Sequence, residues 1–407
     1  MRLTNRLNAQ HIGWWFKKKW QVQGHRKLEE TGAREILEKL GMPVVDALEV
    51  ARAKPVFPRL EIDKFDPEVV EDHTHPNWHD EVCHVYRDRN VLLEGTPQAQ
   101  VLTKTVALQE LPTHLEESIS NAKIVSQTDK NIQNSILASH VFDAEQEKLA
   151  IVKIPERPAF VLPRTYGITD GRRNRLIISK LIFECEKLAG RSTNAQRKIV
   201  NDAKFCVYFE KDGDKLQFNL IADTFMTSKR PLEPVRGKYA DDLPDLYPIK
   251  HTITIPQKNI YTIKDFYPLL GGTQISHPHT IFIHYSPLNV RNLHETPVTQ
   301  TQFEARTLLK AFTVASSRAK QLYGENVKDL PHPVVVQGIQ TDGRKFHFGV
   351  YQLNTLDLNG SEGTKNYWFH KPSLELFSEC CYKVGRPVLE GYNKDVFRHV
   401  LAFYNNC

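Results

Sequence analysis

The clearest hydrophobic pattern in the chain is a pair of β-rich runs separated by an Asp-Gly pair, within residues 333–351. Such a pair between two runs predicts a tight antiparallel hairpin, because the turn needs positive φ angles that glycine adopts at little cost. The turn sequence here is Thr341-Asp342-Gly343-Arg344. Side chains alternate between the two faces of a strand. We therefore expect both faces to be covered, one formed by Phe346, Phe348 and Val350 and the other by His347 and Tyr351.

A second hairpin is predicted at 204–221, where Lys211-Asp212-Gly213-Asp214 separates two runs of aromatic and β-branched residues. Short strands are expected within 82–94 and near 250–255 and 279–285. Between 228 and 248 the chain combines many charges with four prolines, a composition that predicts a loop or a domain boundary. These prolines are Pro231, Pro234, Pro244 and Pro248.

Helical spacing of apolar residues is clearest at 301–323, where Thr301 and Glu304 offer a capping box and Gly324 a C-cap. This helix should pack against the hairpin that follows it. Its apolar positions are Phe303, Leu308, Phe312, Ala315, Ala319 and Leu322. Further helices are expected at about 28–40, 113–121, 128–142, 170–190 and 393–404, whereas 97–108 suits either a helix or a strand.

Strands and helices follow one another without regular alternation, which predicts the α+β class: a mixed sheet with antiparallel hairpins packed by helices. Residues 55–78 are rich in proline, aspartate and histidine and read as an extended segment that wraps over another component. We expect three parts along the chain. They are a basic lead at 1–28, a helical and extended wrapping segment at 29–80, and a globular α+β region at 81–407 with a candidate division near 228–248.

The positive charge of the chain is concentrated at its N-terminus. Residues 1–28 carry seven Lys and Arg and no acid, whereas the net charge of the whole chain is +6, so the remainder sums to −1. An acid-free, arginine-bearing lead with interspersed apolar residues resembles a mitochondrial presequence. A basic arm on nucleic acid is the alternative, because Lys17, Lys18 and Lys19 lie between Trp15 and Trp20. The two interpretations are compatible.

No run of residues approaches the ~18 apolar positions that a membrane-spanning helix requires. The six cysteines, at 83, 185, 206, 380, 381 and 407, show no C-x-x-C spacing and no dense framework, so we expect reduced thiols.

Residues 71–88 contain the side chains that zinc prefers, namely His73, His75, His79, Cys83 and His84. Their spacing fits neither an H-x-H-x-D-H nor an H-E-x-x-H pattern, so surface histidines are the preferred interpretation and a metal-dependent hydrolase the alternative. Phosphate-binding loops and a G-x-S-x-G elbow are missing from the sequence. We expect no catalytic residue, no metal and no cofactor.

Basic residues cluster at 164–204, with ten Lys and Arg against four acids, and again near 229–238. Such patches suit contacts with phosphates, whose attraction is independent of base sequence. A solvated helix face is the alternative interpretation. Together with the N-terminal lysines, the candidate RNA contacts are Lys17, Lys18, Lys19, Arg172, Arg173, Arg175, Arg197, Lys198, Lys229 and Arg230.

Several short sequence motifs occur in an order that is typical of one family. They are KPVFPR at 54–59, RNVLLEGTPQAQVLTKT at 89–105, NIYTI at 259–263, HPHTIFIH at 277–284, AKQLYG at 319–324, PVVVQ, TDGR, QLNT and EGTKN within 333–366, and FRHVLAFY at 397–404. This ordered set resembles the mitochondrial large-subunit ribosomal protein thirty-seven family. A paralogous family, once described as small-subunit and cell-death proteins, shares the general pattern.

The resemblance implies a structural constituent of the large subunit of the mitochondrial ribosome, in the mitochondrial matrix, that supports mitochondrial translation. Its partners would be the large-subunit rRNA and neighbouring ribosomal proteins, including the paralogue, with no membrane span and no small-molecule substrate. A free-standing mitochondrial RNA-binding factor is the alternative, and a hydrolase using the histidines of 73–84 is a third hypothesis.

Overall fold

The computed structural model describes residues 17–19, 31–45, 50, 72–142, 147–149, 166–235, 242–261 and 264–407. The chain divides into two compact units, Met1–Val69 and Val70–Cys407. In the first unit, helix α2 (Ala33–Lys39) lies within the predicted range 28–40, and all its side chains are exposed. Lys17, Lys18 and Lys19 form an exposed helical turn. The rest of the basic lead and residues 55–71 of the extended segment lie outside the described residues.

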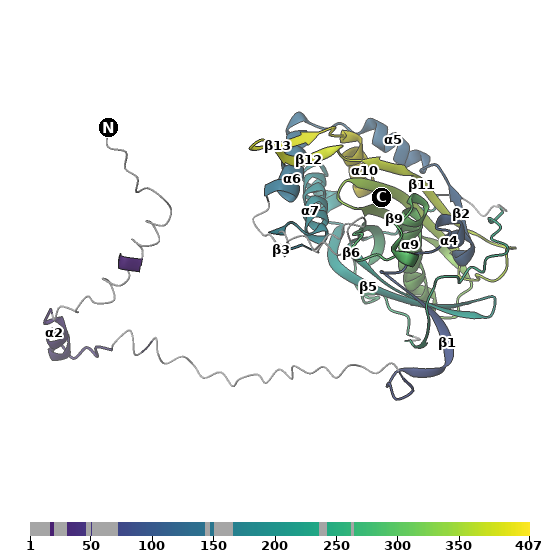
Figure 1. The fold of residues 1–407 in the computed structure, drawn as a ribbon, viewed down its shortest axis with the longest axis horizontal. Helices are drawn as coiled ribbons and strands as arrows, with labels where there is room; N and C mark the ends of the chain where they lie inside the picture. The colour runs from purple at the N-terminus through teal and green to yellow at the C-terminus, as the bar shows by residue number, and fades with distance from the viewer. Residues whose placement is uncertain are drawn as a thin grey trace, which may run out of the picture. The chain divides into compact units, whose positions relative to one another are not determined.

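The second unit is built on a nine-stranded sheet (Figure 1). Its strand order is β2-β11-β10-β9-β8-β6-β1-β7, with β5 paired to β6. Three neighbouring pairs are parallel, β1 with β6, β2 with β11 and β8 with β9, and the others are antiparallel. The sheet is therefore mixed, which confirms the α+β prediction. The strands are β1 (Trp78–Arg87), β2 (Thr105–Leu108), β5 (Arg197–Lys211), β6 (Asp214–Ser228), β7 (Gln257–Ile260), β8 (His277–His284), β9 (Asp329–Thr341), β10 (Lys345–Thr355) and β11 (Asn366–Glu375).

Both predicted hairpins are present. Strands β9 and β10 pair antiparallel, and Gly343 in their turn has φ of 95°. Strands β5 and β6 close on the pair Lys211 and Asp214, and the two turn residues between them, Asp212 and Gly213, both have positive φ. This two-residue turn suits the right-handed twist of the strands it joins. The second hairpin is longer than expected, because the pairing continues to Arg197 and Ser228.

Helix α9 (Gln300–Tyr323) connects the parallel neighbours β8 and β9, as a crossover between parallel strands requires. Its capping box is formed by Thr299 and Gln302, so the prediction of Thr301 and Glu304 was wrong by two residues. Thr299 still has an extended backbone, with φ of −74° and ψ of 165°, whereas Thr301 already lies inside the helix. The predicted end at Gly324 is confirmed.

Hydrophobic cores lie on both faces of the sheet. The first core joins α9 and α4 (Thr96–Thr103) to the strands through Leu308, Phe312 and Tyr351. As predicted, α9 packs against the β9–β10 hairpin. The second core includes Phe346, Phe348 and Val350. Its helices are α5 (Thr113–Asn121), α6 (Ser126–Leu137), α7 (Asp170–Leu188) and α10 (Lys394–Asn405).

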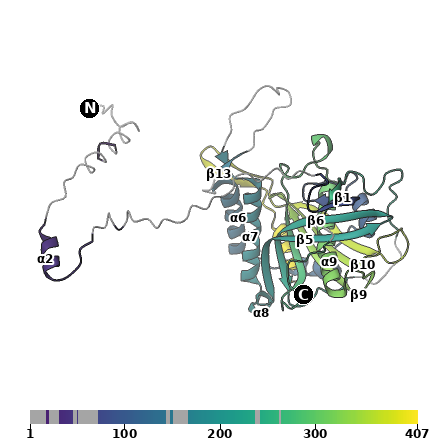
Figure 2. The same ribbon diagram turned by 90° about the horizontal axis from the view of Figure 1, so that it is seen from below.

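The remaining elements lie beside this framework. Figures 1 and 2 show α6 and α7 side by side, and a π-helical turn (Ala138–Phe142) continues α6. Two small antiparallel sheets pair β3 (Glu147–Lys148) with β4 (Tyr166–Gly167) and β12 (Glu379–Lys383) with β13 (Arg386–Glu390). A short helix α8 (Arg191–Asn194) and a 3-10 turn (Leu293–Glu295) complete the set. Among the described residues, no helix is long and apolar enough to span a bilayer.

One sequence expectation needs correction. Residues 250–255 form turns instead of a strand. The carbonyl groups of His251 and Ile253 accept hydrogen bonds from the side-chain amide of Gln98, so they do not pair with a neighbouring strand. Pro256 cannot donate a backbone hydrogen bond, and pairing resumes only at β7. The ambiguous range 97–108 contains both a helix and a strand, α4 and β2, and they meet at Lys104, whose φ is 50°.

Candidate nucleic-acid interface

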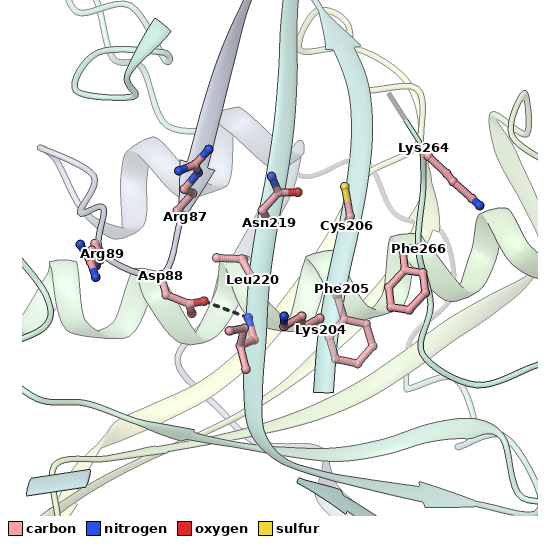
Figure 3. Close-up of a pocket in the computed structure, with 11 residues that line it drawn as sticks. Arg87, Asp88, Arg89, Lys204, Phe205, Cys206, Asn219, Leu220, Lys264 and Phe266 are labelled. Carbon is pink, nitrogen blue, oxygen red and sulfur yellow. Dashed lines mark hydrogen bonds between the residues drawn. The ribbon is translucent and has the colours of Figure 1, made fainter. Parts of the chain in front are cut away.

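Among the described residues, and apart from the contacts of Met226, no helix adds to a core on one face of β1, β5 and β6. The side chains of β5 and β6 that face α9, such as Val207 and Phe218, belong to the first core. On the opposite face, the second core takes only Met226 from these strands, and a small third cluster joins Cys83 and Val85 of β1 to Tyr208 and Tyr261. A pocket of ≈ 770 Å³ opens there, lined by residues of β1, β5 and β6 and by Lys264 and Phe266 (Figure 3).

The strand register explains how distant residues meet in this pocket. Arg87 of β1 pairs with Asn219 of β6, which pairs with Cys206 of β5. Cys206 in turn exchanges two backbone hydrogen bonds with Phe266, of 3.1 and 2.8 Å. Residues in register across a sheet present their side chains on the same face. One row therefore carries a guanidinium group at one end and an aromatic ring at the other.

The pocket is strongly cationic. Its four cations are Arg87, Arg89, Lys204 and Lys264, and Asp88 is its one acid. Within the described part of the chain, none of these four side chains forms an ion pair, whereas Asp88 is 2.5 Å from the ammonium group of Lys310. We refer to the surface formed by the four cations and Phe266 as the cationic groove. Its positive charge is not neutralised by its own lining.

Contacts with α9, β6 and Arg291 hold the turn after β1 in place. Arg306 donates to the carbonyl oxygen of Asp88 at 2.5 Å, and the backbone N–H of Ile221 donates to the Asp88 carboxylate at 3.0 Å. The carbonyl of Arg89 accepts from the N–H of Arg291 at 3.1 Å. These hydrogen bonds fix the backbone that carries the side chains of Arg87 and Arg89.

The opposite wall of the groove is anchored by Asp265. Its carboxylate accepts the N–H of Tyr208 at 2.8 Å and lies 2.9 Å from the ammonium group of Lys320 on α9. The neighbouring Phe266 keeps 47% of its surface exposed. A large aromatic ring held rigidly beside unpaired cations is suited to stacking on a nucleic-acid base.

A second pocket of ≈ 770 Å³ continues the groove toward α7 and brings in two predicted residues, Arg172 and Arg175. The two pockets share Asp88, Arg89, Lys204 and Ile221. Arg175 is bound to both carboxylate oxygens of Asp202, at 2.7 and 2.9 Å, although both side chains are more than half exposed. The charge here is mixed, because Asp202 and Asp223 also line the pocket.

The other predicted residues have different surroundings. Arg173 lies 3.4 Å from Asp170, and Arg197 donates to the carbonyl oxygens of Tyr404 and Asn406 at 3.3 and 2.6 Å. Arg197 therefore helps to hold the C-terminal end of the chain. Lys198, Lys229 and Arg230 are exposed, and so are the three N-terminal lysines. Contact with RNA remains a prediction for all ten candidate residues named in the sequence analysis.

Sequence reasoning did not single out the four cations of the groove. Lys204 was counted within the 164–204 cluster, whereas Arg87, Arg89 and Lys264 belong to no cluster along the chain. A usable signal was the alternation in β5, where apolar residues occupy every second position from Ala203 to Phe209 and Lys204 lies between them, on the opposite face.

Three histidines of 73–84, His75, His79 and His84, already use a ring nitrogen in a hydrogen bond. His79 bonds the carbonyl of Tyr261 at 2.9 Å, and His84 bonds that of Ile255 at 3.2 Å. Burial raises the pKa of the Cys83 thiol to about 12, which disfavours the thiolate that zinc binds. Across the residues that the structure describes, three potential ligands converge within 4.8 Å elsewhere, at Glu304, His347 and His370, and no histidine of 73–84 joins them.

Comparisons with known proteins agree with the resemblance seen in the sequence. Residues 286–407 match the family described as "Mitochondrial 28S ribosomal protein S30 (PDCD9)", the paralogous pattern. The large ribosomal subunit protein mL37 of Rattus norvegicus is 30% identical over 379 residues, which cover 86% of this chain and 82% of the relative. The mL37 of Mus musculus gives the same values, and that of Bos taurus is 28% identical over 95% of this chain and 87% of its own.

These names denote structural ribosomal proteins and not enzymes, as expected from the sequence. The identity of 30% and the coverage of 86% of this chain and 82% of the relative place the chain within one family. The protein is a member of the mL37 family of large ribosomal subunit proteins.

Proposed function

We propose that this protein is a structural constituent of the large subunit of the mitochondrial ribosome, where it binds rRNA and neighbouring ribosomal proteins and supports translation in the matrix. Membership of the mL37 family supports the subunit, and the matching family description supports the mitochondrial setting. The observation that supports RNA binding is the cationic groove, whose four cations form no ion pair with any residue that the structure describes and lie beside an exposed aromatic ring.

The chemistry of the groove favours single-stranded rRNA. Open sheet faces with aromatic side chains bind unstacked bases, and cations along the groove hold the phosphates without reading sequence. Arg87 is on β1, which pairs with β6 and β7, and Lys204 is on β5, which pairs with β6, so their backbone is already ordered before RNA binds. Arg172 and Arg175 extend the same surface and would add phosphate contacts beyond it.

The N-terminal parts are proposed to serve import and assembly. Residues 1–28 act as a presequence or as a basic arm on rRNA, and residues 29–80 wrap over a neighbouring component. On α2, Ile36 and Leu40 are 61% and 65% exposed and stand one helical turn apart. An apolar stripe on an exposed helix is suited to contact with a protein partner.

The proposal predicts that the protein sediments with the large ribosomal subunit. Mitochondrial lysate would be fractionated on a sucrose gradient after a moderate salt wash, and the protein followed by immunoblot. We expect it to remain with the large subunit, since an assembly protein buries several surfaces at once. A protein found only near the top of the gradient would instead be a free RNA-binding factor or a hydrolase, and the proposed function would be rejected.

Charge reversal in the groove tests the RNA interface directly. In the triple variant Arg87→Glu, Lys204→Glu, Lys264→Glu, we expect weaker binding of a 12-nucleotide uridine RNA. The slope of log affinity against log salt should become about 2 units less steep, at ~0.7 per lost phosphate contact on a single strand. Fluorescence anisotropy at several salt concentrations measures both quantities.

The matched control reverses three exposed cations outside the groove, Lys345, Arg386 and Lys394. Their reversal changes the net charge equally, so it should leave most of the salt slope in place. If the two triple variants reduce the slope to the same extent, the binding depends on overall charge and the groove is not the interface.

A further inference from the structure

Three side chains from different elements meet beside the β9–β10 hairpin. They are Glu304 of α9, His347 of β10 and His370 of β11. Nε2 of His347 lies 3.3 Å from Nδ1 of His370, and that nitrogen lies 3.8 Å from Oε2 of Glu304. The two histidines are 0% and 5% exposed, so the cluster is almost entirely shielded from solvent.

The spacing of these atoms is that of ligands around one small cation. Zinc–nitrogen bonds of about 2.0–2.1 Å in a tetrahedral site place two ligand nitrogens ~3.3–3.4 Å apart. The two histidine nitrogens have this separation. The glutamate oxygen is slightly farther away, at 3.8 Å, and a small side-chain rotation would bring it to the same distance.

Two of the atoms that would not touch the cation are already hydrogen-bonded. Nδ1 of His347 bonds the hydroxyl of Thr307 at 2.9 Å, which leaves Nε2 directed at the cluster. Oε1 of Glu304 accepts from the amide of Gln300 at 2.8 Å, which leaves Oε2. Such outer hydrogen bonds orient the ligands in metal sites and select the tautomer of the histidine.

The local backbone also departs from a regular ladder at this point. The pairing of β10 with β11 shifts register between Phe346 and Phe348, opposite Pro372, which has no N–H to donate. His347 lies opposite this step, and β10 itself continues to pair regularly with β9. By the ordinary alternation of a strand, His347 faces α9, whereas Phe346 and Phe348 belong to the second core.

Burial keeps both histidines in the form that binds metal. It lowers the pKa of His347 to about 3 and also lowers that of His370, so both rings are neutral at physiological pH. A neutral imidazole has a free lone pair for a cation. Burial raises the pKa of Glu304, and a cation beside its carboxylate would offset this effect.

We propose that Glu304, His347 and His370 form a binding site for a divalent transition-metal ion, with zinc as the ion that two imidazoles and one carboxylate favour. The site would connect α9 to β10 and β11 and leave a fourth position for water. It goes beyond the proposed ribosomal function and departs from the expectation of no metal, which rested on residues close together in the sequence. Without metal, the same groups form a hydrogen-bonded chain from Thr307 through both histidines.

The test uses the full chain, stripped with a chelator, incubated with zinc sulfate and desalted. We expect about one zinc ion per chain by elemental analysis, as for a site with three protein ligands. Cobalt substitution should give the intense visible absorption of a tetrahedral site. In His370→Gln and, separately, Glu304→Gln, bound zinc should fall at least tenfold.

The control variant His73→Gln, His75→Gln removes two other histidines of the same unit and should keep full zinc binding. Circular dichroism establishes that each variant is folded. Since the wild-type chain is itself measured, a stripped and reloaded wild type without zinc overturns the proposal, whether or not the variants fold. Retention of zinc by both His370→Gln and Glu304→Gln overturns it as well. Sedimentation with the ribosome is unaffected by either outcome.

Discussion

Replacing Gly349 by alanine is expected to lower the free energy of unfolding by about 3 kcal/mol, the upper part of the range for overpacking a core. A Cβ atom at this position would lie 2.2 Å from both Cη2 and Cζ2 of Trp368, whose side chain is fully buried. The glycine pairs with Gly338 on β9, and this pair gives the indole its space on the sheet. Urea unfolding followed by tryptophan fluorescence measures the change.

Gly271→Ala is the matched control, because a Cβ atom there would meet open space and its φ is not positive. We expect a change within ~0.5 kcal/mol for this surface substitution. If Gly349→Ala proved as mild as Gly271→Ala, the close approach of Trp368 to the β10 backbone would be incorrect.

The substitution Asp265→Ala should have a similarly large effect, about 3–5 kcal/mol, as expected when one partner of a buried ion pair is removed. The side chains of Asp265 and Lys320 are 13% and 9% exposed, so the lysine would keep a charge with little access to water. The N–H of Tyr208 would also lose its acceptor. Denaturant unfolding gives the stability, and the uridine RNA should bind more weakly because Lys264 and Phe266 lose their anchor.

The exposed pair of Arg344 and Glu375, with both side chains more than 40% exposed, supplies the comparison. Glu375→Ala should cost at most ~1 kcal/mol, since water screens the remaining charge. The double variant Asp265→Leu, Lys320→Met should recover much of the stability lost in Asp265→Ala, because no unpaired charge is then buried. Equal losses for Asp265→Ala and Glu375→Ala would show that the Asp265 pair is not buried in solution.

Local chemistry explains the elements that were predicted correctly. The Asp-Gly turns at 212–213 and 342–343 need backbone angles that few other residue pairs adopt, so each determines a hairpin without reference to the rest of the fold. Helices α9 and α10 combine apolar spacing with end signals within the same segment. In such cases the information lies within about twenty neighbouring residues.

The groove and the Glu304–His347–His370 cluster could not be predicted in this way. Arg87 and Lys204 meet only because β1 and β5 both pair with β6, and that pairing depends on cores built from the whole second unit. The histidine at 347 was expected on a covered face, and it is there, but nothing near it in the sequence indicates Glu304 as its neighbour. The turns at 250–255 were missed because their acceptors serve Gln98, far away along the chain.

The strand order has a consequence for how the protein matures. Strand β2 pairs with β11, the last strand of the sheet along the chain, although about 260 residues separate their registers, as in the pair Thr105 and Asn366. Pairings so distant in sequence are slow to form and cannot begin while the later strand is still being synthesised. Until β11 is available, β2 lacks the one strand with which it pairs in the described sheet. The topology therefore predicts that this end of the sheet is completed late in folding.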